Sequence, residues 1–283
     1  MIETNPNYSQ PVNNIVGFIH VAGGGTRLKN KGYQDLDMWP KELLSIPYNN
    51  SEFGLKRATM IDRTLLELRK EGFSNFLCFT SSDNGSSLTR THIEAFYGEN
   101  KLIPVKMSHY TGQSAEGAAG SSYLAINKLD LNSLCYMTPG DTLFPFNKLH
   151  GAIASHYKTK ADITWTVTDT ADESAQNKGR IIIEPSGKVI GAFERENIAH
   201  KAQAYDESMR FTSTGVIVVD TNVYKKIFEE YVSDSRPSGP LDLWRDVINW
   251  AISKKYHIYG YNIAEPAQDL GEVDRLRSVG GLI

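Results

Sequence analysis

Short apolar runs bounded by glycine, proline or polar residues recur along the chain. The run at 15–21 is β-branched and ends at glycines, which is typical of a buried strand. Similar runs predict further strands, and the two runs that flank Pro185-Ser-Gly-Lys188 predict a β-hairpin. The expected strands are 15–21, 76–80, 103–107, 134–138, 163–168, 179–184, 189–194, 212–220 and 256–261.

Apolar positions at helical spacing fall between several of these runs. In 58–71, Ile61, Leu65 and Leu68 share one face. The expected helices are 58–71, 88–97, 147–156, 221–232, 241–253 and 272–279. Alternating strands and helices favour βαβ units, so we expect an α/β fold with a doubly wound, mostly parallel sheet flanked by helices. Two polar, turn-rich stretches, 28–40 and 47–57, are expected to be loops.

Composition narrows the class of protein. The 283 residues are long enough for one large α/β domain, and we expect a leader at 1–13 and a single domain at 14–283. A net charge of −3 argues against a nucleic-acid-binding protein. No apolar run approaches the roughly 18 residues of a membrane span, and we therefore expect a cytoplasmic protein. The two cysteines lie in apolar runs, as buried reduced thiols do.

The first strand leads into a glycine-rich loop. Gly23, Gly24 and Gly25 can present backbone N–H groups to a ligand, and Arg27 adds a guanidinium fork that suits phosphate oxygens. Lys41, which follows a proline, supplies a second cation. Neither G-x-x-x-x-G-K-[ST] nor G-x-G-x-x-G is present in this stretch, so a Walker ATPase or a nicotinamide-dependent dehydrogenase is not supported.

Ala22-Gly-Gly-Gly-Thr-Arg-Leu28 with the later Pro40-Lys-Glu-Leu-Leu44 resembles the signature of the sugar-1-phosphate nucleotidyltransferases. The resemblance extends from about 16 to 276 and implies a Rossmann-like (GT-A-like) sheet with a nucleotide-binding half, about 14–145, and a sugar-binding half, about 146–283, that contains the β-hairpin. It also implies transfer of a nucleotidyl group from a nucleoside triphosphate to a sugar 1-phosphate, with release of pyrophosphate. Relatives of this size form dimers or tetramers.

Two aspartates follow strand-like runs at matching places in the family pattern. Asp141, after Pro139-Gly140, could be a simple turn residue, and Asp269 could cap a helix. The resemblance makes both of them ligands of Mg²⁺. It assigns Arg27 to the leaving pyrophosphate and Lys41 to the α-phosphate, as the catalytic cations.

The remaining site residues are also assigned through the resemblance. The residues expected to bind the nucleotide are Ala22, Gly23, Gly24, Gly25, Thr26, Gln113 and Gly117, and those expected to bind the sugar phosphate are Gly140, Gly179, Glu194, Arg195 and Thr214. On the residues alone, 113–125 could be a small-residue helix packed on the sheet, and 194–196 could be a solvated charge cluster.

Two other functions stay open at this point. A GT-A-type glycosyltransferase would share the sheet and a metal-binding aspartate, but it needs no clamp for pyrophosphate. A non-catalytic nucleotide-sugar-binding regulatory protein would not need both Asp141 and Asp269. The sequence favours a pyrimidine base and does not identify the sugar, and the expected product would serve polysaccharide biosynthesis.

Overall fold

The computed structural model of the chain describes residues 14–21, 40–81, 84–112, 116–169, 179–193, 200–265, 267–269 and 278–280. The chain folds into two compact units, each built from stretches that are distant in sequence. Unit 1 comprises Met1–Pro11, Ala115–Met137 and Asn147–Pro266, and unit 2 comprises Val12–Ser114, Thr138–Phe146 and Ala267–Ile283.

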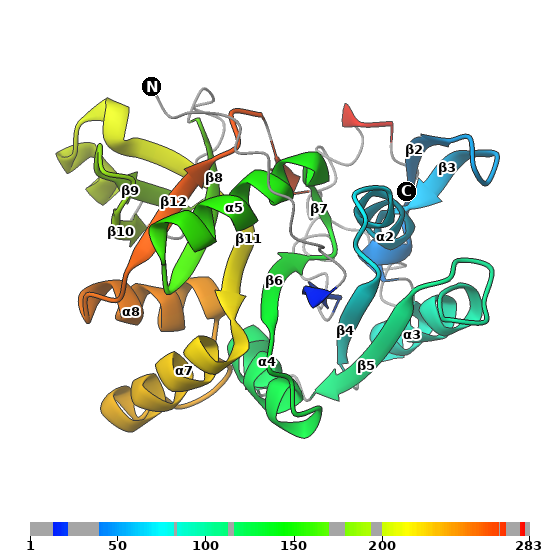
Figure 1. Ribbon diagram of the computed structural model, residues 1–283, viewed down its shortest axis with the longest axis horizontal. Helices are drawn as coiled ribbons and strands as arrows, with labels where there is room; N and C mark the ends of the chain where they lie inside the picture. The colour runs from blue at the N-terminus through cyan, green and yellow to red at the C-terminus, as the bar shows by residue number, and fades with distance from the viewer. Residues whose placement is uncertain are drawn as a thin grey trace. The chain divides into compact units, whose positions relative to one another are not determined.

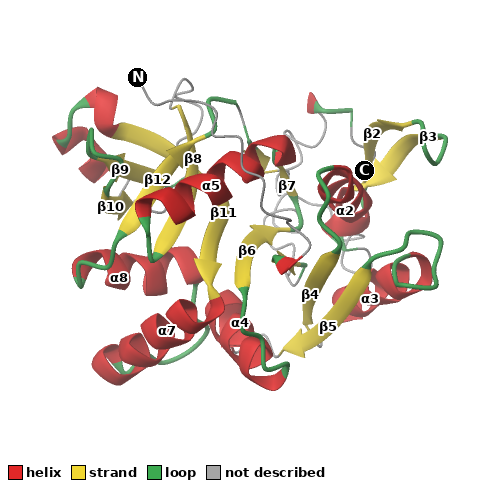
Figure 2. Ribbon diagram, viewed as in Figure 1, coloured by secondary structure: helices red, strands yellow, loops and turns green. Residues whose placement is uncertain are grey.

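The structure confirms the expected α/β class. The structure contains both helices and strands (Figure 2), and the described residues include a main sheet of nine strands. The sheet is mixed, with parallel pairs in both units and antiparallel pairs around one long strand of unit 1. Among the helices that the structure describes, none is long and apolar enough to cross a membrane.

Unit 2 is built on three parallel strands. β1 pairs with β4, and β4 pairs with β5, so the carboxyl ends of all three meet at one edge. The expected strand at 15–21 is β1, and its residues are buried except at the last position, as in a strand covered on both faces. The elements of unit 2 are β1 (Val16–His20), β2 (Ser45–Asn50), β3 (Leu55–Thr59), α2 (Met60–Lys70), β4 (Asn75–Ser81), α3 (Asn84–Phe96), β5 (Lys106–Gly112), β7 (Thr142–Leu143) and β13 (Gln268–Asp269).

Polar side chains fix the start of α2 and connect it to α3. Thr59 is the N-cap, and its hydroxyl accepts a hydrogen bond from the N–H of Asp62 at 3.1 Å. The Asp62 carboxylate in turn accepts hydrogen bonds from the Tyr97 hydroxyl at 2.7 Å and pairs with the His92 ring at 2.8 Å. The apolar face expected at Ile61, Leu65 and Leu68 is buried, and so the two helices are held by both apolar and polar contacts.

Unit 1 is organised around the long strand β11. This strand runs antiparallel to β6, β8 and β9, while β12 adds a parallel pair at the far side of β8. The elements of unit 1 are α4 (Gly117–Lys128), β6 (Leu134–Pro139, whose last two residues belong to unit 2), α5 (Leu149–Thr159), β8 (Ile163–Asp169), β9 (Arg180–Ile183), β10 (Val189–Phe193), β11 (Arg210–Asp220), α7 (Thr221–Ser235), α8 (Asn249–Ser253) and β12 (Ile258–Asn262).

Helices cover the strands of unit 1. α5 packs on β8, β11 and β12, and it crosses in front of them in Figure 1. α7 packs on β11 and on α4, where the buried Tyr224 hydroxyl donates to the carbonyl of Ala119 at 2.8 Å. The fully buried Trp165 donates its indole N–H to the Ser213 hydroxyl at 3.0 Å, which joins β8 to β11. The buried Tyr224 and Trp165 thus both place their polar atoms in hydrogen bonds.

The structure differs from the sequence prediction at three elements. The stretch 47–57 is the antiparallel hairpin β2–β3, in which Gly54 at φ 63° makes the turn that glycine adopts without strain. Pro47 is tolerated there because a two-stranded sheet leaves edge positions that need no N–H donor. The strand expected at 103–107 begins at Lys106, and 241–253 is a π-helical turn, Leu243–Ile248, that leads into the short α8.

The buried histidine of α5 predicts a pH-dependent stability. Burial lowers the pKa of His156 to about 4, although the charges of Asp220 and Asp162 partly oppose the shift. The folded state thus binds fewer protons than the unfolded state between pH 6.5 and about 4, so stability is present above 6.5 and is lost as the pH falls through this window. The loss is about 1.4 kcal/mol per pH unit.

Chemical unfolding at a series of pH values tests this expectation. His156→Gln should flatten the profile between pH 6.5 and 4, because glutamine keeps a polar partner for the Thr164 hydroxyl, which lies 3.1 Å from His156 Nδ1, but takes up no proton. An unchanged slope in the variant would contradict the assignment.

Candidate active site

Lys41 and Asp141, which the sequence analysis assigned to phosphate and metal, form an ion pair in unit 2. The Lys41 ammonium contacts Oδ2 of Asp141. The two side chains are only 12% and 8% exposed, so water screens the pair weakly. Lys41 opens a 3₁₀ turn, Lys41–Leu43, directly after Pro40, and Asp141 follows the end of β6. The structure therefore unites two predicted residues that are a hundred positions apart.

A close backbone approach orients Asp141. The N–H of Gly140 donates to the carbonyl of His20 at 2.9 Å, which joins the end of β6 to the end of β1. A Cβ atom at position 140 would lie 2.7 Å from Cγ1 of Val21 and 3.2 Å from the His20 carbonyl oxygen. Only glycine fits here without a shift of its neighbours, so Gly140 acts by letting two chain segments meet.

Asp269 is placed next to this cluster at the level of the backbone. β13 pairs antiparallel with β7, and in this register Asp269 lies opposite Thr142, the residue after Asp141. Opposed residues of antiparallel strands have Cα atoms about 4.5–5.5 Å apart. The two aspartates expected to hold a metal thus lie on neighbouring backbone segments.

This pair of positions fits a hard cation. Carboxylate oxygens are the ligands that Mg²⁺ takes from proteins, usually one or two of them, with water and phosphate completing its shell. Among the side chains that the structure describes, no group of three or more His, Cys, Asp or Glu residues gathers as a metal site of protein ligands alone.

Glu42 is a member of the cluster that the sequence analysis did not assign. Its side chain is 1% exposed, and its Oε2 atom is buried and meets no hydrogen-bond partner in the part of the chain that the structure describes. Burial raises the pKa of Glu42 to about 7, the nearby Asp141 charge raises it too, and the Lys41 charge lowers it. In the sequence Glu42 is an ordinary polar residue beside an apolar stretch, and no periodicity reveals that it points inward.

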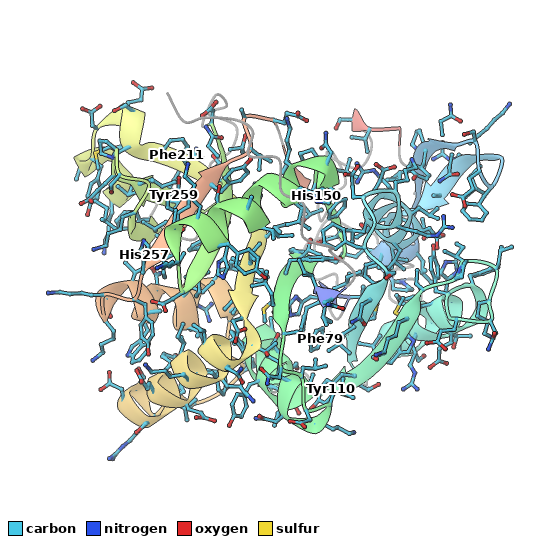
Figure 3. All side chains as sticks on the ribbon, in the orientation of Figure 1. Phe79, Tyr110, His150, Phe211, His257 and Tyr259 are labelled. Atoms are coloured by element: carbon cyan, nitrogen blue, oxygen red, sulfur yellow. The ribbon has the colours of Figure 1, made fainter. Side chains whose placement is uncertain are left out.

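Aromatic rings lie along the carboxyl ends of the three parallel strands. His20 of β1 stacks on Phe79 of β4 with ring centroids 4.8 Å apart, and Tyr110 of β5 lies 6.1 Å from Phe79 (Figure 3). Burial lowers the pKa of His20 to about 4, so its ring is neutral at physiological pH. The half-buried Tyr110 lies at the strand edge where α/β sheets bind their ligands.

Two residues expected to bind the sugar phosphate come together in unit 1. The carbonyl of Gly179 accepts a hydrogen bond at 3.0 Å from the N–H of Ser213, next to Thr214. The Thr214 side chain is buried, and its hydroxyl donates to the carbonyl of Thr166 at 2.9 Å. This hydroxyl is therefore engaged inside the sheet, and the backbone of 213–215 is the part closest to Gly179.

Gly117 begins α4 in a conformation that suits only glycine. Its φ is +67°, and a Cβ atom there would lie 2.4 Å from both the nitrogen and the oxygen of Leu241. Backbone hydrogen bonds hold the same contact, since Leu241 donates to the Glu116 carbonyl at 3.2 Å and accepts from Ala119 at 3.0 Å. The start of α4 is thereby fixed against the segment that precedes Leu243.

The other predicted site residues lie outside the described residues, and their roles stay predictions. They are Ala22, Gly23, Gly24, Gly25, Thr26 and Arg27 of the glycine-rich loop, Gln113, and Glu194 with Arg195 at the end of the hairpin.

Comparison with known proteins adds an independent finding. The family profile described as "Nucleotidyl transferase" matches residues 49–280. A structure of a provisionally assigned glucose-1-phosphate thymidylyltransferase from Bacillus anthracis, solved with sucrose, is similar with a TM-score of 0.69 at 17% identity, over 94% of this chain and 93% of that one. The inositol-1-phosphate CTP transferase from T. maritima is similar with a TM-score of 0.65 at 15% identity, over 93% and 92%. No curated protein matches the chain.

The close contact between Gly117 and Leu241 predicts that one added methyl group will lower the stability of the protein strongly. Gly117→Ala should lower the free energy of unfolding by about 2–3 kcal/mol, because it adds a steric clash with Leu241 to the strain of a positive φ. Gly239→Ala is the matched control, since φ is +87° there and nothing lies within 4 Å of the added atom. That change should cost about 1 kcal/mol.

Urea unfolding of both variants measures the difference. Equal losses would mean that the α4 start does not depend on the contact with Leu241.

Proposed function

The chain belongs to the nucleotidyl transferase family, and we propose that it transfers a nucleotidyl group from a nucleoside triphosphate to a sugar 1-phosphate with Mg²⁺ as cofactor. The observation that carries this proposal is the buried cluster of Lys41, Glu42 and Asp141, with the backbone of Asp269 beside it. A nucleotidyl transfer needs both a cation for the phosphate oxygens and carboxylates for a metal.

The names of the two similar structures support a sugar 1-phosphate as the proposed acceptor. One is named as acting on glucose 1-phosphate and the other on inositol 1-phosphate, and both compounds are phosphate monoesters on a six-membered ring. Their names specify thymidylyl transfer and CTP, which agrees with our proposal of a pyrimidine base.

The reaction requires little proton transfer by the protein. The acceptor phosphate is already anionic, so it can attack the α-phosphorus without a strong general base. Catalysis then depends on alignment and on neutralising charge. Mg²⁺, when bound, would supply positive charge to the phosphate oxygens of the nucleotide.

Each residue has a defined part in this scheme. Asp141 and Asp269 would hold the Mg²⁺ ion, and Lys41 would turn from Asp141 to the α-phosphate. Arg27, on the glycine-rich loop, would neutralise the leaving pyrophosphate. The rest of the nucleotide would be bound by residues 22–26, Gln113 and Gly117, and the sugar phosphate by Gly140, Gly179, Glu194, Arg195 and Thr214.

The proposal has wider consequences. The product would be a nucleotide sugar, the activated donor that polysaccharide biosynthesis consumes. Both substrates are cytoplasmic metabolites, so a cytoplasmic enzyme is part of the proposal. A dimer or tetramer is its expected oligomeric state.

Asp141→Asn tests the assignment of the metal carboxylate. The change removes the charge but preserves the shape, and we expect pyrophosphate release to fall at least about 100-fold. The control is Asp130→Asn, at an exposed position with φ 47° where asparagine is well tolerated. It should retain the wild-type rate.

The assay uses a panel of nucleoside triphosphates and sugar 1-phosphates with Mg²⁺. Absence of pyrophosphate from every combination with the wild-type protein would refute the proposed reaction. Release of nucleoside diphosphate from a nucleotide sugar would instead indicate a glycosyltransferase.

A further inference from the structure

The carboxyl group of Glu42 is one of several buried polar groups that are not fully hydrogen-bonded within the described residues. Its side chain is 1% exposed, and none of the described residues forms a hydrogen bond with the buried Oε2 atom. Such a group lowers the stability of the folded state, and it does so more when it is charged. A buried acceptor that has no protein partner usually contacts a water molecule or an ion.

The position of Glu42 indicates which kind of ligand could contact its Oε2 atom. Cγ of Glu42 lies 3.6 Å from where a Cβ atom at Gly140 would be, so the side chain runs past the residue that precedes Asp141. The charge of Asp141 raises the pKa of Glu42, which means that the two carboxyl groups are near enough to repel. Lys41 lies near both, but its ammonium contacts Asp141.

Among the described side chains of this cluster, carboxyl groups outnumber cations. Asp141 and Glu42 contribute two carboxyl groups from described side chains, Asp269 adds a third position on the neighbouring backbone, and Lys41 is the cation that contacts Asp141. A hydrated divalent cation would satisfy this arrangement, because bound water donates hydrogen bonds while the ion supplies charge. A structural role alone would be served as well by an uncharged side chain of similar volume.

We propose that Glu42 is a positioning residue of the cation site, where its Oε2 accepts a hydrogen bond from a water molecule of the Mg²⁺ held by Asp141 and Asp269. The role is an outer one, because Mg²⁺ usually takes only one or two carboxylates directly and keeps several of its water molecules. This inference rests on the proposed Mg²⁺-dependent function. It adds that the affinity of the nucleotide-free protein for the cation depends on Glu42, the residue after the catalytic Lys41.

Binding of Mn²⁺ to the full-length protein without nucleotide tests the inference, with electron paramagnetic resonance as the readout. Glu42→Gln should weaken Mn²⁺ binding about 10-fold, as loss of an outer-shell partner of a metal site does. Glu42→Asp keeps the charge and withdraws the oxygen by one methylene, and it should restore part of the affinity. Glu52→Gln, an exposed carboxylate of unit 2 that pairs with Arg69, is the control and should bind as the wild type does.

The outcomes separate this inference from the proposed function. If Asp141→Asn loses Mn²⁺ binding while Glu42→Gln keeps wild-type affinity, the role of Glu42 is refuted and the metal site stands. If the wild-type protein binds no Mn²⁺, with or without nucleoside triphosphate, the proposed cofactor itself is wrong. Should Glu42→Gln fail to fold, Glu42→Asp decides alone, because unchanged affinity in that variant would overturn the inference.

Discussion

The meeting of two strand ends in unit 2 is the constraint on which the candidate site depends. Gly140 donates to His20 across the gap between β6 and β1, and the absence of a side chain at Gly140 is what allows this approach. Asp141 leaves β6 from that fixed point and meets Lys41. A larger residue at position 140 would clash with Val21 and with the His20 carbonyl.

Burial of this cluster sets its electrostatics. An ion pair that is about one-tenth exposed is stronger than a surface pair, but each charge has also lost most of its hydration. Glu42 adds a carboxyl group whose Oε2 atom has no hydrogen-bond partner among the described residues. The site can therefore accept both an additional positive charge and a hydrogen-bond donor. In the proposed reaction, Mg²⁺ bound with a nucleoside triphosphate would supply positive charge, and Lys41 would pair with the phosphates.

Much of the fold followed from local patterns. Five elements lie close to their expected bounds because their apolar patterns are clear. They are the strands around 15–21, 163–168 and 212–220 and the helices at 58–71 and 221–232. The hairpin β2–β3 was missed because Pro47 and the polar Asn49 and Asn50 are typical of turns. The pairing of β13 with β7 could not be anticipated, because two-residue strands carry no period and their partners are far apart in sequence.

The site was predictable only where the chain carries a motif. Lys41, Gly140 and Asp141 stand in recognisable surroundings, and the structure brings them together. Glu42 was not predicted, since burial of a carboxylate depends on tertiary packing that the sequence does not display. The hydrogen bond of Thr214 to Thr166 was likewise invisible, because it depends on the register of β11 and β8.

The central claim is that Lys41 and Asp141 act together on one reaction centre. A double-mutant cycle on pyrophosphate release measures this directly, with Lys41→Met, Asp141→Asn and the double variant compared in kcat/KM. Residues that work as a unit are strongly non-additive, so the double variant should lose little more than the worse single variant. Losses that multiply, with the double variant as slow as two independent defects predict, would contradict the account.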